Sequence, residues 1–373
     1  MDALTTLSNW QKVRLGDIGK PCMCKRVMKH QTTRYGEIPF YKIGTFGNTA
    51  DAFISKKLFL EYKTKYSFPK KGDILISASG TIGRAVIYDG KPAYFQDSNI
   101  VWIDNDETLV KNDFLFYAYS NVKWNTEHTT ILRLYNDNFR NTLIPLPPLN
   151  EQIAIANVLS DVDRYLYSLD ALILKKESVK KALSFELLSQ RKRLKGFNQA
   201  WQKVRLGDIA NYLTSNLSAE QITQQGKIKV YDVNNFIGYT NTTFISDKPY
   251  ISIVKDGSVG RVRILPPKTN ILSTMGALIA NHKTTTEFLF YLLSNFDFKN
   301  FTSGSIIPHI YFKDYKEKTI FLPPLNEQIA IANILSDLDH EIISLKNKKR
   351  QFENIKKALN HDLMSAKIRV LKK

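Results

Sequence analysis

Cysteine is nearly absent, since the 373 residues contain only Cys22 and Cys24, with one residue between them. A structural zinc site needs four Cys or His ligands, and neither a second cysteine pair nor a nearby histidine cluster is present. The sequence therefore predicts no metal site. We expect both cysteines to be free thiols in a reducing compartment.

Long hydrophobic runs are absent as well. No apolar segment approaches the ~18 residues that cross a bilayer, and the N-terminus lacks the apolar core of a signal peptide. Hydrophobic residues make up 43% of the chain, which is ordinary for a globular protein. We expect a soluble, intracellular chain, and its length indicates two or more domains.

Catalytic motifs are missing too. The chain has no phosphate-binding loop ending in Gly-Lys-Ser/Thr, no recognisable loop for S-adenosylmethionine and no convincing nuclease carboxylate cluster. An adenine methyltransferase is expected to carry Asn/Asp-Pro-Pro-Tyr/Phe, whereas the Pro-Pro pairs at 147–148, 266–267 and 323–324 all follow leucine. The sequence predicts no catalytic residue and no bound cofactor. The enzymatic alternative is a nuclease that uses scattered carboxylates such as Asp97 or Asp232.

Negative charge is scarce relative to positive charge. The chain has 53 Lys and Arg against 35 Asp and Glu, a formal net charge of +18. The positive residues are distributed along the chain rather than collected in a tail. A distributed positive field on a folded protein suits a polyanion that touches several domains, such as DNA or RNA. The simpler alternative is that the charge serves solubility alone.

What the sequence does contain is a duplication. The segment Leu146–Asp163, LPPLNEQIAIANVLSDVD, returns at Leu322–Asp339 with two conservative changes. A second segment, WQKVRLGDI, occupies Trp10–Ile18 and again Trp201–Ile209. Each half therefore consists of this N-terminal tag, a variable middle, and LPPLNEQ with the segment that follows it. We interpret the chain as a tandem duplication whose middles have diverged.

The two middles are predicted to share one α+β fold. Residues 38–46 and 72–78 are rich in β-branched and aromatic residues and are bounded by Pro and Gly, as in strands. Residues 114–122 are expected to form a short helix. The segment 230–236 stands in the second half where 40–46 stands in the first. The second middle is shorter and lacks a counterpart of residues 56–70.

A short motif, Gly-x-x-Gly-Arg, occurs in both middles, as SGTIGR at Ser79–Arg84 and DGSVGR at Asp256–Arg261. One interpretation is a hairpin turn in which glycine supplies a positive φ. The other is that the glycines let the backbone approach a nucleic-acid strand while Arg84 or Arg261 reaches a phosphate or a guanine edge. The sequence leaves both open.

A long helix is predicted after each LPP. Asn150 is a good N-cap with Glu151 in the first turn, and apolar residues then recur at the alternating 4-3 spacing of a coiled-coil seam. The seam positions are Ile155, Leu159, Val162, Leu166, Leu169 and Ile173 in the first copy, and Ile331, Leu335, Leu338, Ile342, Leu345, Phe352, Leu359 and Leu363 in the second.

Each helix should have roughly 40 residues and a length of about 60 Å. We expect the two to pair antiparallel; the alternative is two separate amphipathic helices, each packed on its own domain. Lys180 and Lys356 interrupt the seams. The first helix is expected to end in its basic last turn, residues 191–193, with Gly196 as the C′ residue.

The order of tag, variable domain, LPPLNEQ and long helix, occurring twice, resembles the specificity subunit of type I restriction–modification enzymes. The resemblance covers essentially the whole chain. It implies that each variable part is a target recognition domain that reads one half of a bipartite double-stranded DNA site. It also implies that the paired helices set the spacer and dock two methyltransferase subunits, with restriction subunits in the full complex. S-adenosylmethionine would belong to the partner methyltransferase, and the location would be the prokaryotic cytoplasm.

The expected architecture is thus α+β, pseudo-twofold, with two tandem target recognition domains separated by two long helices that form an antiparallel coiled coil. The predicted boundaries are 1–149 for the first recognition domain, 150–195 for the first spacer helix, 196–325 for the second recognition domain and 326–373 for the second spacer helix.

Two groups of site residues are predicted. The candidates for DNA binding are Ser79, Gly80, Thr81, Gly83, Arg84, Arg133, Tyr135, Gly257, Ser258, Gly260, Arg261, His309 and Tyr311. For Tyr135 and Tyr311, a place in a strand core is the more ordinary interpretation. The resemblance implies that the methyltransferase subunits are contacted by Pro147, Pro148, Glu151, Gln152, Ile155, Pro323, Pro324, Glu327, Gln328 and Ile331. As cap and core residues they also have a structural explanation, and both can hold.

One alternative function belongs to another class. A stand-alone regulator or architectural DNA-binding protein would use the long helices as its own ruler, without a methyltransferase partner.

Overall fold

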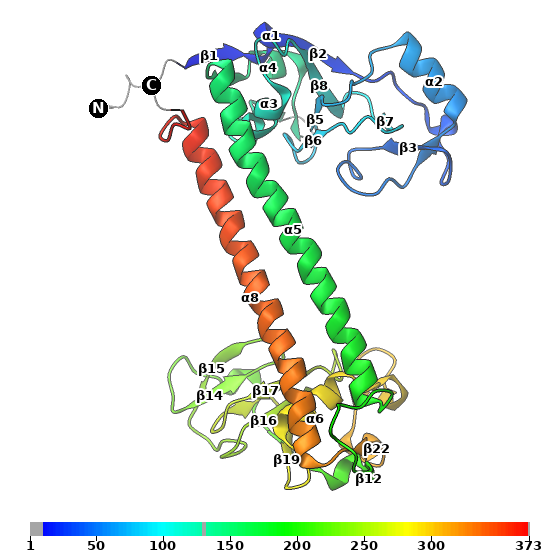
Figure 1. Cartoon of the computed structure of the whole chain (residues 1–373), viewed down its shortest axis with the longest axis vertical. Helices are drawn as coiled ribbons and strands as arrows, with labels where there is room; N and C mark the ends of the chain where they lie inside the picture. Colours follow the sequence, from blue (N-terminus) through cyan, green and yellow to red (C-terminus); the bar gives the residue numbers. More distant parts are fainter. Residues whose placement is uncertain (1–9, 129–131, 372–373) are drawn as a thin grey trace. The chain divides into compact units, whose positions relative to one another are not determined.

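The computed structural model describes residues 10–128 and 132–371. The chain divides into two compact units, Met1–Leu169 with Lys349–Lys373 and Asp170–Lys348. Each long helix therefore contributes one part to each unit (Figure 1).

The first unit is built on a four-stranded antiparallel sheet. The strand order is β2-β8-β5-β6, with bounds Gly19–Met23, Ile100–Asn105, Ile74–Ser77 and Ala85–Ile87. All four residues of β5, ILIS, are buried, and the strand lies within the segment 72–78 that the sequence predicted to be a strand. The helices of this unit's domain are α1 (Leu15–Ile18), α2 (Lys56–Lys65), α3 (Asn112–Tyr119) and α4 (Asn136–Asn141), with a 3₁₀ turn at Lys29–Gln31. Helix α3 supplies the fully buried Phe114 and Leu115 to the core shared with Ile76 and Ile103.

A second, smaller sheet lies in the same unit. Its strand order is β4-β3-β7, with bounds Phe53–Ile54, Ile38–Tyr41 and Tyr94–Phe95. Helix α2 begins after Ser55, whose hydroxyl oxygen accepts a hydrogen bond from the Leu58 N–H at 3.2 Å, a normal N-cap. Aromatic rings fill this part of the core; the Phe59 and Phe68 rings, for example, meet edge to face at 5.6 Å.

The second unit repeats both sheets. The four-stranded sheet has the order β13-β19-β16-β17, with bounds Ala210–Thr214, Met275–Ala280, Tyr250–Val254 and Val262–Leu265. The three-stranded sheet has the order β15-β14-β18, with bounds Phe236–Thr240, Ile228–Tyr231 and Asn270–Ile271. Helix α6 (Thr286–Ser294) is the counterpart of α3, and 3₁₀ turns lie at Leu206–Asp208, Ala219–Gln221 and Lys299–Phe301. No described element of this unit corresponds to α2, so the predicted missing segment is confirmed.

The duplicated tags form the first strand of each unit. Strand β1 (Gln11–Arg14) pairs antiparallel with β11 (Leu143–Leu146), and β12 (Gln202–Arg205) pairs antiparallel with β22 (Thr319–Leu322). In each unit the tag thus lies beside the strand that precedes the Pro-Pro pair. The tag and the strand before the Pro-Pro pair thus form one two-stranded sheet in each unit.

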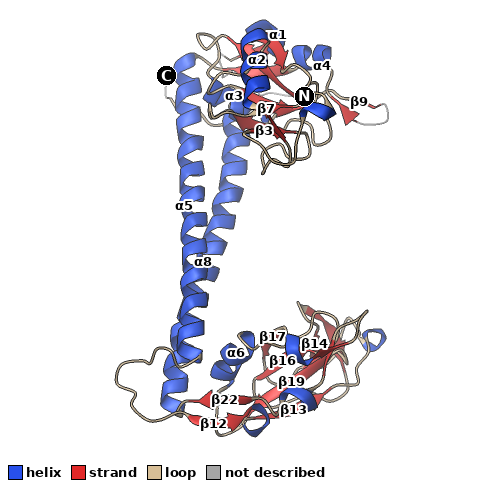
Figure 2. Ribbon diagram, turned by 90° about the vertical axis from the view of Figure 1, so that its right-hand side faces the viewer, coloured by secondary structure: helices blue, strands red, loops and turns tan. Residues whose placement is uncertain are grey.

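The two long helices are α5 (Leu149–Leu188) and α8 (Leu325–Met364), each 40 residues long and continuous in Figure 2. In the first unit, Asp163 and Tyr165 of α5 meet Lys356 and Phe352 of α8, so the partner number falls as the number on α5 rises. In the second unit Lys176 and Lys180 meet Glu341 and Asp339 in the same descending order. The helices pair antiparallel, as predicted, and the alternative of two separate helices is wrong.

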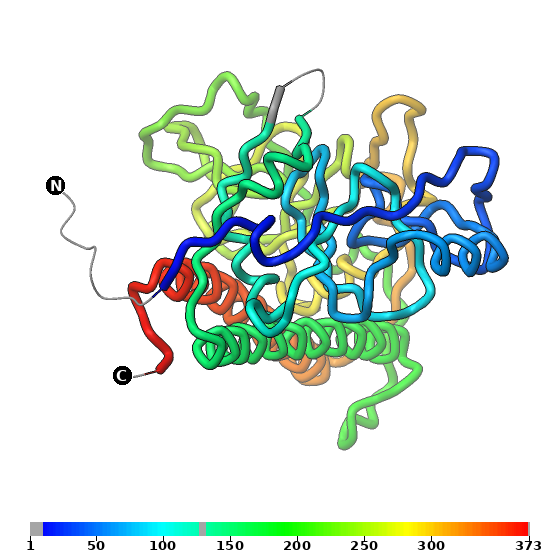
Figure 3. Tube along the Cα trace, turned by 90° about the horizontal axis from the view of Figure 1, so that it is seen from above, coloured from blue at the N-terminus to red at the C-terminus, as the bar shows by residue number. Residues whose placement is uncertain are grey.

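The helix ends differ from the prediction. Helix α5 ends at Leu188, and its C′ position is taken by Gln190 in the left-handed conformation with φ +62°, rather than by Gly196. Helix α8 ends in the same way, with Ala366 at φ +54°. In the first unit the chain beyond α8, red in Figure 3, lies beside the start of α5, where Arg369 reaches Glu151. The basic triplet 191–193 therefore follows the helix instead of closing it.

Candidate nucleic-acid interface

In the first unit the Gly-x-x-Gly-Arg motif and Arg133, distant in sequence, come together. Ser79 and Arg133 form an antiparallel bridge, and the Leu134 N–H donates to the Ala78 carbonyl at 2.9 Å. Arg133 lies in strand β10 (Leu132–Arg133), which pairs antiparallel with β9 (Glu127–His128). Two separately predicted parts of the DNA-binding set are thus neighbours.

The second unit has the same bridge with different chemistry. Asp256 pairs with His309, which belongs to the hairpin of β20 (Thr302–Ser303) and β21 (His309–Ile310). The Gly257 N–H donates to the Pro308 carbonyl at 2.8 Å. His309 Nδ1 lies 2.6 Å from Asp256 Oδ1, so the side chains meet as well as the backbones. The same backbone frame carries Ser79 and Arg133 in one unit and a carboxylate–imidazole pair in the other.

The glycines of the motif have two different roles. All four have positive φ, so the hairpin-turn interpretation is confirmed. A Cβ on Gly83 would lie 2.1 Å from the Trp124 indole nitrogen, and one on Gly260 would lie 2.5 Å from the Phe298 ring. A Cβ on Gly80 or Gly257 would meet nothing within 4 Å. The second glycine is therefore needed for packing, whereas the first is open on its outer side.

The arginines that close the motif hold a neighbouring loop. Arg84 Nη1 donates to the Phe46 carbonyl at 2.8 Å, and Arg261 Nη2 donates to Asn234 Oδ1 at 3.0 Å. These acceptors lie in the loops that follow β3 and β14. Both arginines remain exposed. Their structural role is thus established, and a contact with phosphate or guanine stays a prediction.

The remaining candidates lie on the surface of their units. Tyr135 is 40% exposed and Tyr311 50% exposed, so their interpretation as strand-core aromatics is wrong. The Tyr311 ring is nearly parallel to that of His309 at 6.5 Å. Thr81 and Ser258 occupy the turn, where the Thr81 carbonyl accepts a hydrogen bond from the Ser77 hydroxyl. A tyrosine beside the bridge in both units is compatible with stacking on a base.

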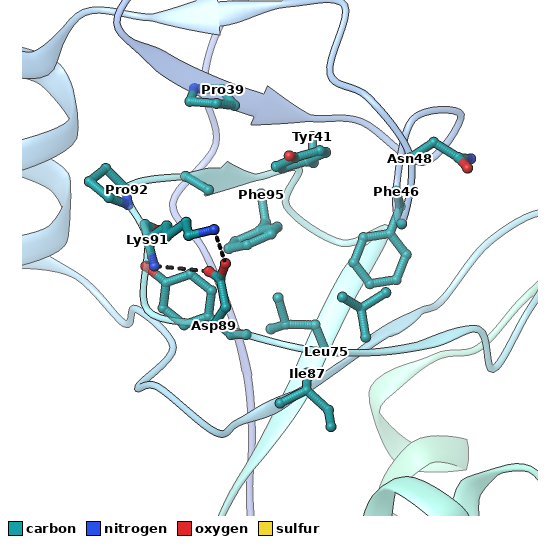
Figure 4. A pocket seen from close by; sticks show the side chains of 14 residues that line it. Pro39, Tyr41, Phe46, Asn48, Leu75, Ile87, Asp89, Lys91, Pro92 and Phe95 are labelled. Atoms are coloured by element: carbon teal, nitrogen blue, oxygen red, sulfur yellow. Dashed lines mark hydrogen bonds and ion pairs between the residues drawn. The ribbon is translucent and has the colours of Figure 1, made fainter. Parts of the chain in front are cut away.

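Two pockets flank the small sheet of the first unit, one on each face of β3, because neighbouring side chains of a strand point to opposite faces. One pocket, of about 430 Å³, is lined by Pro39, Tyr41 and Phe95 among others. Figure 4 shows Tyr41 beside Phe95, with their rings stacked at 5.8 Å, and the Asp89–Lys91 ion pair at the same pocket. The other pocket, of about 510 Å³, contains Phe40 and Lys42.

The second unit carries different side chains at the place that corresponds to the aromatic pocket. There Arg263 occupies the register position of Val86, and its guanidinium lies 5.4 Å from the centroid of the Tyr231 ring. Arg263 Nη1 also donates to the Asn234 carbonyl at 2.9 Å. A long cationic side chain thus stands where the first unit has Val86, so the two middles differ in chemistry at the same position of one fold.

The Glu and Gln of the LPPLNEQ segment are buried in both copies. Glu151 is 2% exposed and accepts hydrogen bonds from Trp10 Nε1 at 3.1 Å and from Arg369 Nε and Nη2 at 2.9 and 2.6 Å. Glu327 is fully buried in the same arrangement, with Trp201 Nε1 at 3.0 Å and Arg193 Nη2 at 2.6 Å. The hydrogen bond to Glu327 further raises the pKa of Arg193. Each duplicated Trp is thus fixed to a duplicated Glu.

The neighbouring glutamines join the start of each long helix to its domain through hydrogen bonds. Gln152 Nε2 donates to the Pro147 carbonyl at 2.9 Å, and its Oε1 accepts from the Lys111 N–H at 2.9 Å. Gln328 Nε2 donates to the Pro323 carbonyl at 2.8 Å, and its Oε1 accepts from the Thr284 hydroxyl at 2.8 Å.

Of the ten residues predicted to contact methyltransferase, only Pro148 is exposed and Pro324 half-buried. The buried eight are Pro147, Glu151, Gln152, Ile155, Pro323, Glu327, Gln328 and Ile331. They serve as cap and core residues, and their contact with another subunit stays a prediction.

Sequence reasoning missed two features of the surface. The tip of the β20–β21 hairpin carries Ile306, 92% exposed, and Ile307, 54% exposed. The polar pocket beside Arg133 draws residues from several segments. No periodicity or spacing marks either one, because both depend on which loops the fold brings together.

Within the part of the chain that the structure describes, no group of three His, Cys, Asp or Glu side chains could hold a metal ion. No helix among those residues is long and apolar enough to cross a membrane. Cys22 and Cys24 are free cysteines.

Comparisons with known proteins give a consistent family. Residues 7–176 and 198–354 match the type I restriction modification DNA specificity domain. A putative type I restriction enzyme specificity subunit of Haemophilus influenzae is 63% identical over 148 residues, which are 39% of this chain and 38% of that protein. The putative MjaX specificity subunit of Methanocaldococcus jannaschii is 30% identical over 336 residues, 80% of this chain and 79% of that protein.

Solved structures show the same fold. The S subunit of a type I restriction–modification system from M. genitalium superposes with a TM-score of 0.65 at 20% identity, covering 97% of this chain and 98% of that one. A chain from a structure of type I R-M complex assembly and conformational transition gives a TM-score of 0.56 at 15% identity, covering 95% and 97%.

Two like domains, each closed by a tag strand and joined to paired helices, define a tandem DNA-specificity protein. The chain belongs to the family of type I restriction–modification specificity subunits. Proteins of this class recognise DNA and are not catalytic.

Proposed function

We propose that each unit reads one half of an asymmetric bipartite site in double-stranded DNA. The observation that carries this proposal is the repeated bridge, which has Arg133 in one unit and His309 with Asp256 in the other. A guanidinium donates hydrogen bonds, whereas a carboxylate accepts them, so the two bridges suit different base edges. Two domains that share one fold but carry different side chains at the bridge would therefore select two different half-sites.

The charge of the chain supports duplex DNA as the partner. A net charge of +18 favours binding to phosphates regardless of sequence, and such binding falls steeply with salt because counterions are released. Specificity then comes from side chains at base edges in the major groove. Measuring affinity for the cognate site and for random duplex between about 50 and 200 mM salt separates the two contributions.

The chain also docks two methyltransferase subunits in this proposal, one at the start of each long helix. Leu149 and Ile153 are 37% and 44% exposed, and their duplicates Leu325 and Ile329 are 45% and 47% exposed. Apolar side chains kept at the surface in both copies are typical of a contact with another protein. These residues extend the predicted contact beyond the buried Glu and Gln.

The docking can be tested by counting subunits. Ile153→Asp should leave a complex with one methyltransferase, and the double variant Ile153→Asp/Ile329→Asp a chain with none. Native mass spectrometry of complexes with the methyltransferase partner measures the stoichiometry, and Leu174→Asp, at a 64% exposed apolar site farther along the same helix, is the matched control. Two bound subunits in the double variant would contradict this docking site.

The paired helices set the spacer between the half-sites, and restriction subunits join the full complex. S-adenosylmethionine is bound by the methyltransferase, and the complex acts in the prokaryotic cytoplasm. Deleting one heptad from each long helix should shorten the preferred spacer. The purified chain alone should neither methylate nor cleave DNA, and turnover by clean protein would contradict this assignment.

A further inference from the structure

Hydrogen bonds hold together the segments that surround the polar pocket of the first unit, the second pocket described above. The Ala78 N–H donates to the Asn99 carbonyl at 2.7 Å, and the Ser79 hydroxyl donates to Asn99 Oδ1 at 2.7 Å. Ser79 in turn forms the bridge with Arg133. The segments that contain residues 78–79, Asn99 and Arg133 are therefore joined to one another by hydrogen bonds.

The pocket has a volume of about 510 Å³ and is strongly cationic. Four of its lining residues are positive, Arg26, Lys29, Lys42 and Arg133, and one is negative, Asp97. Arg26 Nε lies 2.8 Å from Asp97 Oδ2, and Lys42 Nζ lies 2.8 Å from Asp51 Oδ1, so two of the four cations are paired. Lys29 and Arg133 form no ion pair within the described part of the chain, and both are exposed. These two cations are available to an anionic or electron-rich partner.

The neutral polar groups of the pocket also offer donors. The oxygen of the Gln96 amide is occupied, because Oε1 accepts the Ile43 N–H at 3.0 Å. The oxygen of the Asn99 amide is occupied by the Ser79 hydroxyl. Each amide therefore has its NH₂ group left for a further partner. Because Asp97 Oδ2 is engaged by Arg26, the free charged groups of the pocket are a guanidinium and an ammonium, which together with the two NH₂ groups favour a partner that offers acceptors.

Among the base-pair edges in the major groove, guanine alone presents two acceptors, N7 and O6, and no donor. Adenine and cytosine each bring an NH₂ group, which would oppose the donors of this pocket. We propose that the pocket reads a guanine of the first half-site, with Arg133 facing N7 and O6, Gln96 and Asn99 beside it, and Lys29 at a flanking phosphate. This inference rests on the proposed function, since it names the base for a DNA-reading unit.

The second unit supplies an internal contrast. At the corresponding bridge Asp256 stands in place of Ser79 and His309 in place of Arg133, and the two side chains meet at 2.6 Å, so the free guanidinium of the first unit has no counterpart there. Replacing Arg133 should therefore affect one half-site and leave the other unchanged.

The test uses the complex of the full chain with its methyltransferase. Methylome sequencing first gives the bipartite motif, and duplexes are then made with 7-deazaguanine at each guanine in turn, which removes N7 and keeps base pairing. For the unaltered chain, 7-deazaguanine at one position of one half-site should weaken binding by about 2- to 13-fold, the effect of losing one of the two hydrogen bonds of a bidentate contact. Arg133→Ala should abolish the sensitivity at that position only. Gln96→Ala should reduce it.

Lys57→Ala is the matched control, because it also removes one exposed positive charge, on helix α2. It should retain the full 7-deazaguanine effect, and thermal unfolding of both variants should match that of the unaltered chain. A half-site without a sensitive guanine, or an Arg133→Ala complex that keeps the sensitivity, would overturn the inference while leaving the proposed function in place. A methylome with no motif that depends on this chain would overturn both.

Discussion

Lys356 Nζ lies 2.5 Å from Asp163 Oδ1 and so joins α8 to α5 inside the first unit. The second carboxylate oxygen of Asp163 accepts a hydrogen bond from the Tyr117 hydroxyl at 2.8 Å. Lys356 Nζ is also 5.7 Å from the centroid of the Tyr117 ring. Burial raises the pKa of Tyr117, and the hydrogen bond to Asp163 raises it further, so the phenol stays a neutral donor. A lysine that interrupts the apolar seam thus connects both long helices with α3.

The second unit repeats this arrangement. Lys180 Nζ lies 2.5 Å from Asp339 Oδ1, and the Tyr291 hydroxyl donates to Asp339 Oδ2 at 2.9 Å. The lysine is 5.6 Å from the Tyr291 ring centroid. The matched geometry of the two copies indicates that these polar residues fix the register of the two long helices. They also fix the position of α3 or α6 against the helix pair within each unit.

Lys356→Met tests this role. The substitution leaves the half-buried Asp163 with one partner fewer, and we expect the free energy of unfolding to fall by about 1.5–3 kcal/mol, as for a lost hydrogen bond to a charged group. Urea unfolding measures the change. The matched control is Lys346→Met, because Lys346 pairs with Glu177 at 2.6 Å with side chains 55% and 42% exposed. Such an exposed pair contributes about 0–1 kcal/mol.

Exchanging the charges gives a second check on the same pair. Lys356→Asp combined with Asp163→Lys should recover part of the loss, since the attraction is restored in reversed order. Equal destabilisation by Lys356→Met and Lys346→Met would show that the Lys356 pair has no special role.

The two glycines of the first turn should respond differently to alanine. Gly80→Ala introduces a Cβ into open space at φ +65°, and it should cost about 1 kcal/mol for the left-handed backbone alone. Gly83→Ala must in addition displace the Trp124 indole, which adds about 1–3 kcal/mol. Thermal unfolding of the two variants measures the difference. Equal stabilities would mean that the indole moves away without cost.

The ends of the long helices can be improved. Gln190 and Ala366 occupy left-handed conformations at φ +62° and +54°, which cost a non-glycine residue about 1–2 kcal/mol. Glycine removes this strain. It also gives the unfolded chain more conformational entropy, which lowers the free energy of unfolding by about 0.4–1 kcal/mol. Gln190→Gly and Ala366→Gly should each stabilise by about 0.5–1 kcal/mol in urea unfolding. The neighbouring Ser189→Gly should not stabilise, and a gain there of the same size would point to a cause other than the left-handed backbone.

Cys22 and Cys24 should differ in reactivity. Cys24 is 2% exposed, and burial raises its pKa to about 12, whereas Cys22 is only half-buried and its pKa is raised, first by burial. Because the thiolate is the reactive form, native protein should show one thiol whose labelling rate keeps rising above pH 9, and a second that reacts only on unfolding. Cys22→Ser should remove the fast phase in a thiol-labelling assay. Two thiols of equal rate would contradict the described burial.

The sequence predicted the duplicated parts of the fold well, namely the tag strands and the two long helices, because their structure is encoded by nearby residues. Duplicated tags, the Pro-Pro stops and the 4-3 apolar spacing each fix a strand or helix through nearby residues. The antiparallel pairing of α5 and α8 and the hairpin turn at Ser79–Arg84 were therefore foreseeable. The end of α5 was not, since Gln190 adopts a conformation that usually signals glycine.

The binding surface was harder to predict because it is assembled from distant loops. Arg133 was a candidate, but its bridge with Ser79 depends on the sheet topology. The pocket residues Lys29 and Gln96 carry no sequence signal of their own. For Tyr135 the more ordinary interpretation, a place in a strand core, was wrong, since the side chain is 40% exposed. A tyrosine next to a short strand is as compatible with the surface as with the core.

The most direct test of the central claim is methylome sequencing of cells that express this chain with its methyltransferase, compared with cells that lack the chain. The account predicts methylated adenines in one asymmetric bipartite motif that disappears when the chain is deleted. A methylome in which no motif depends on the chain would contradict it.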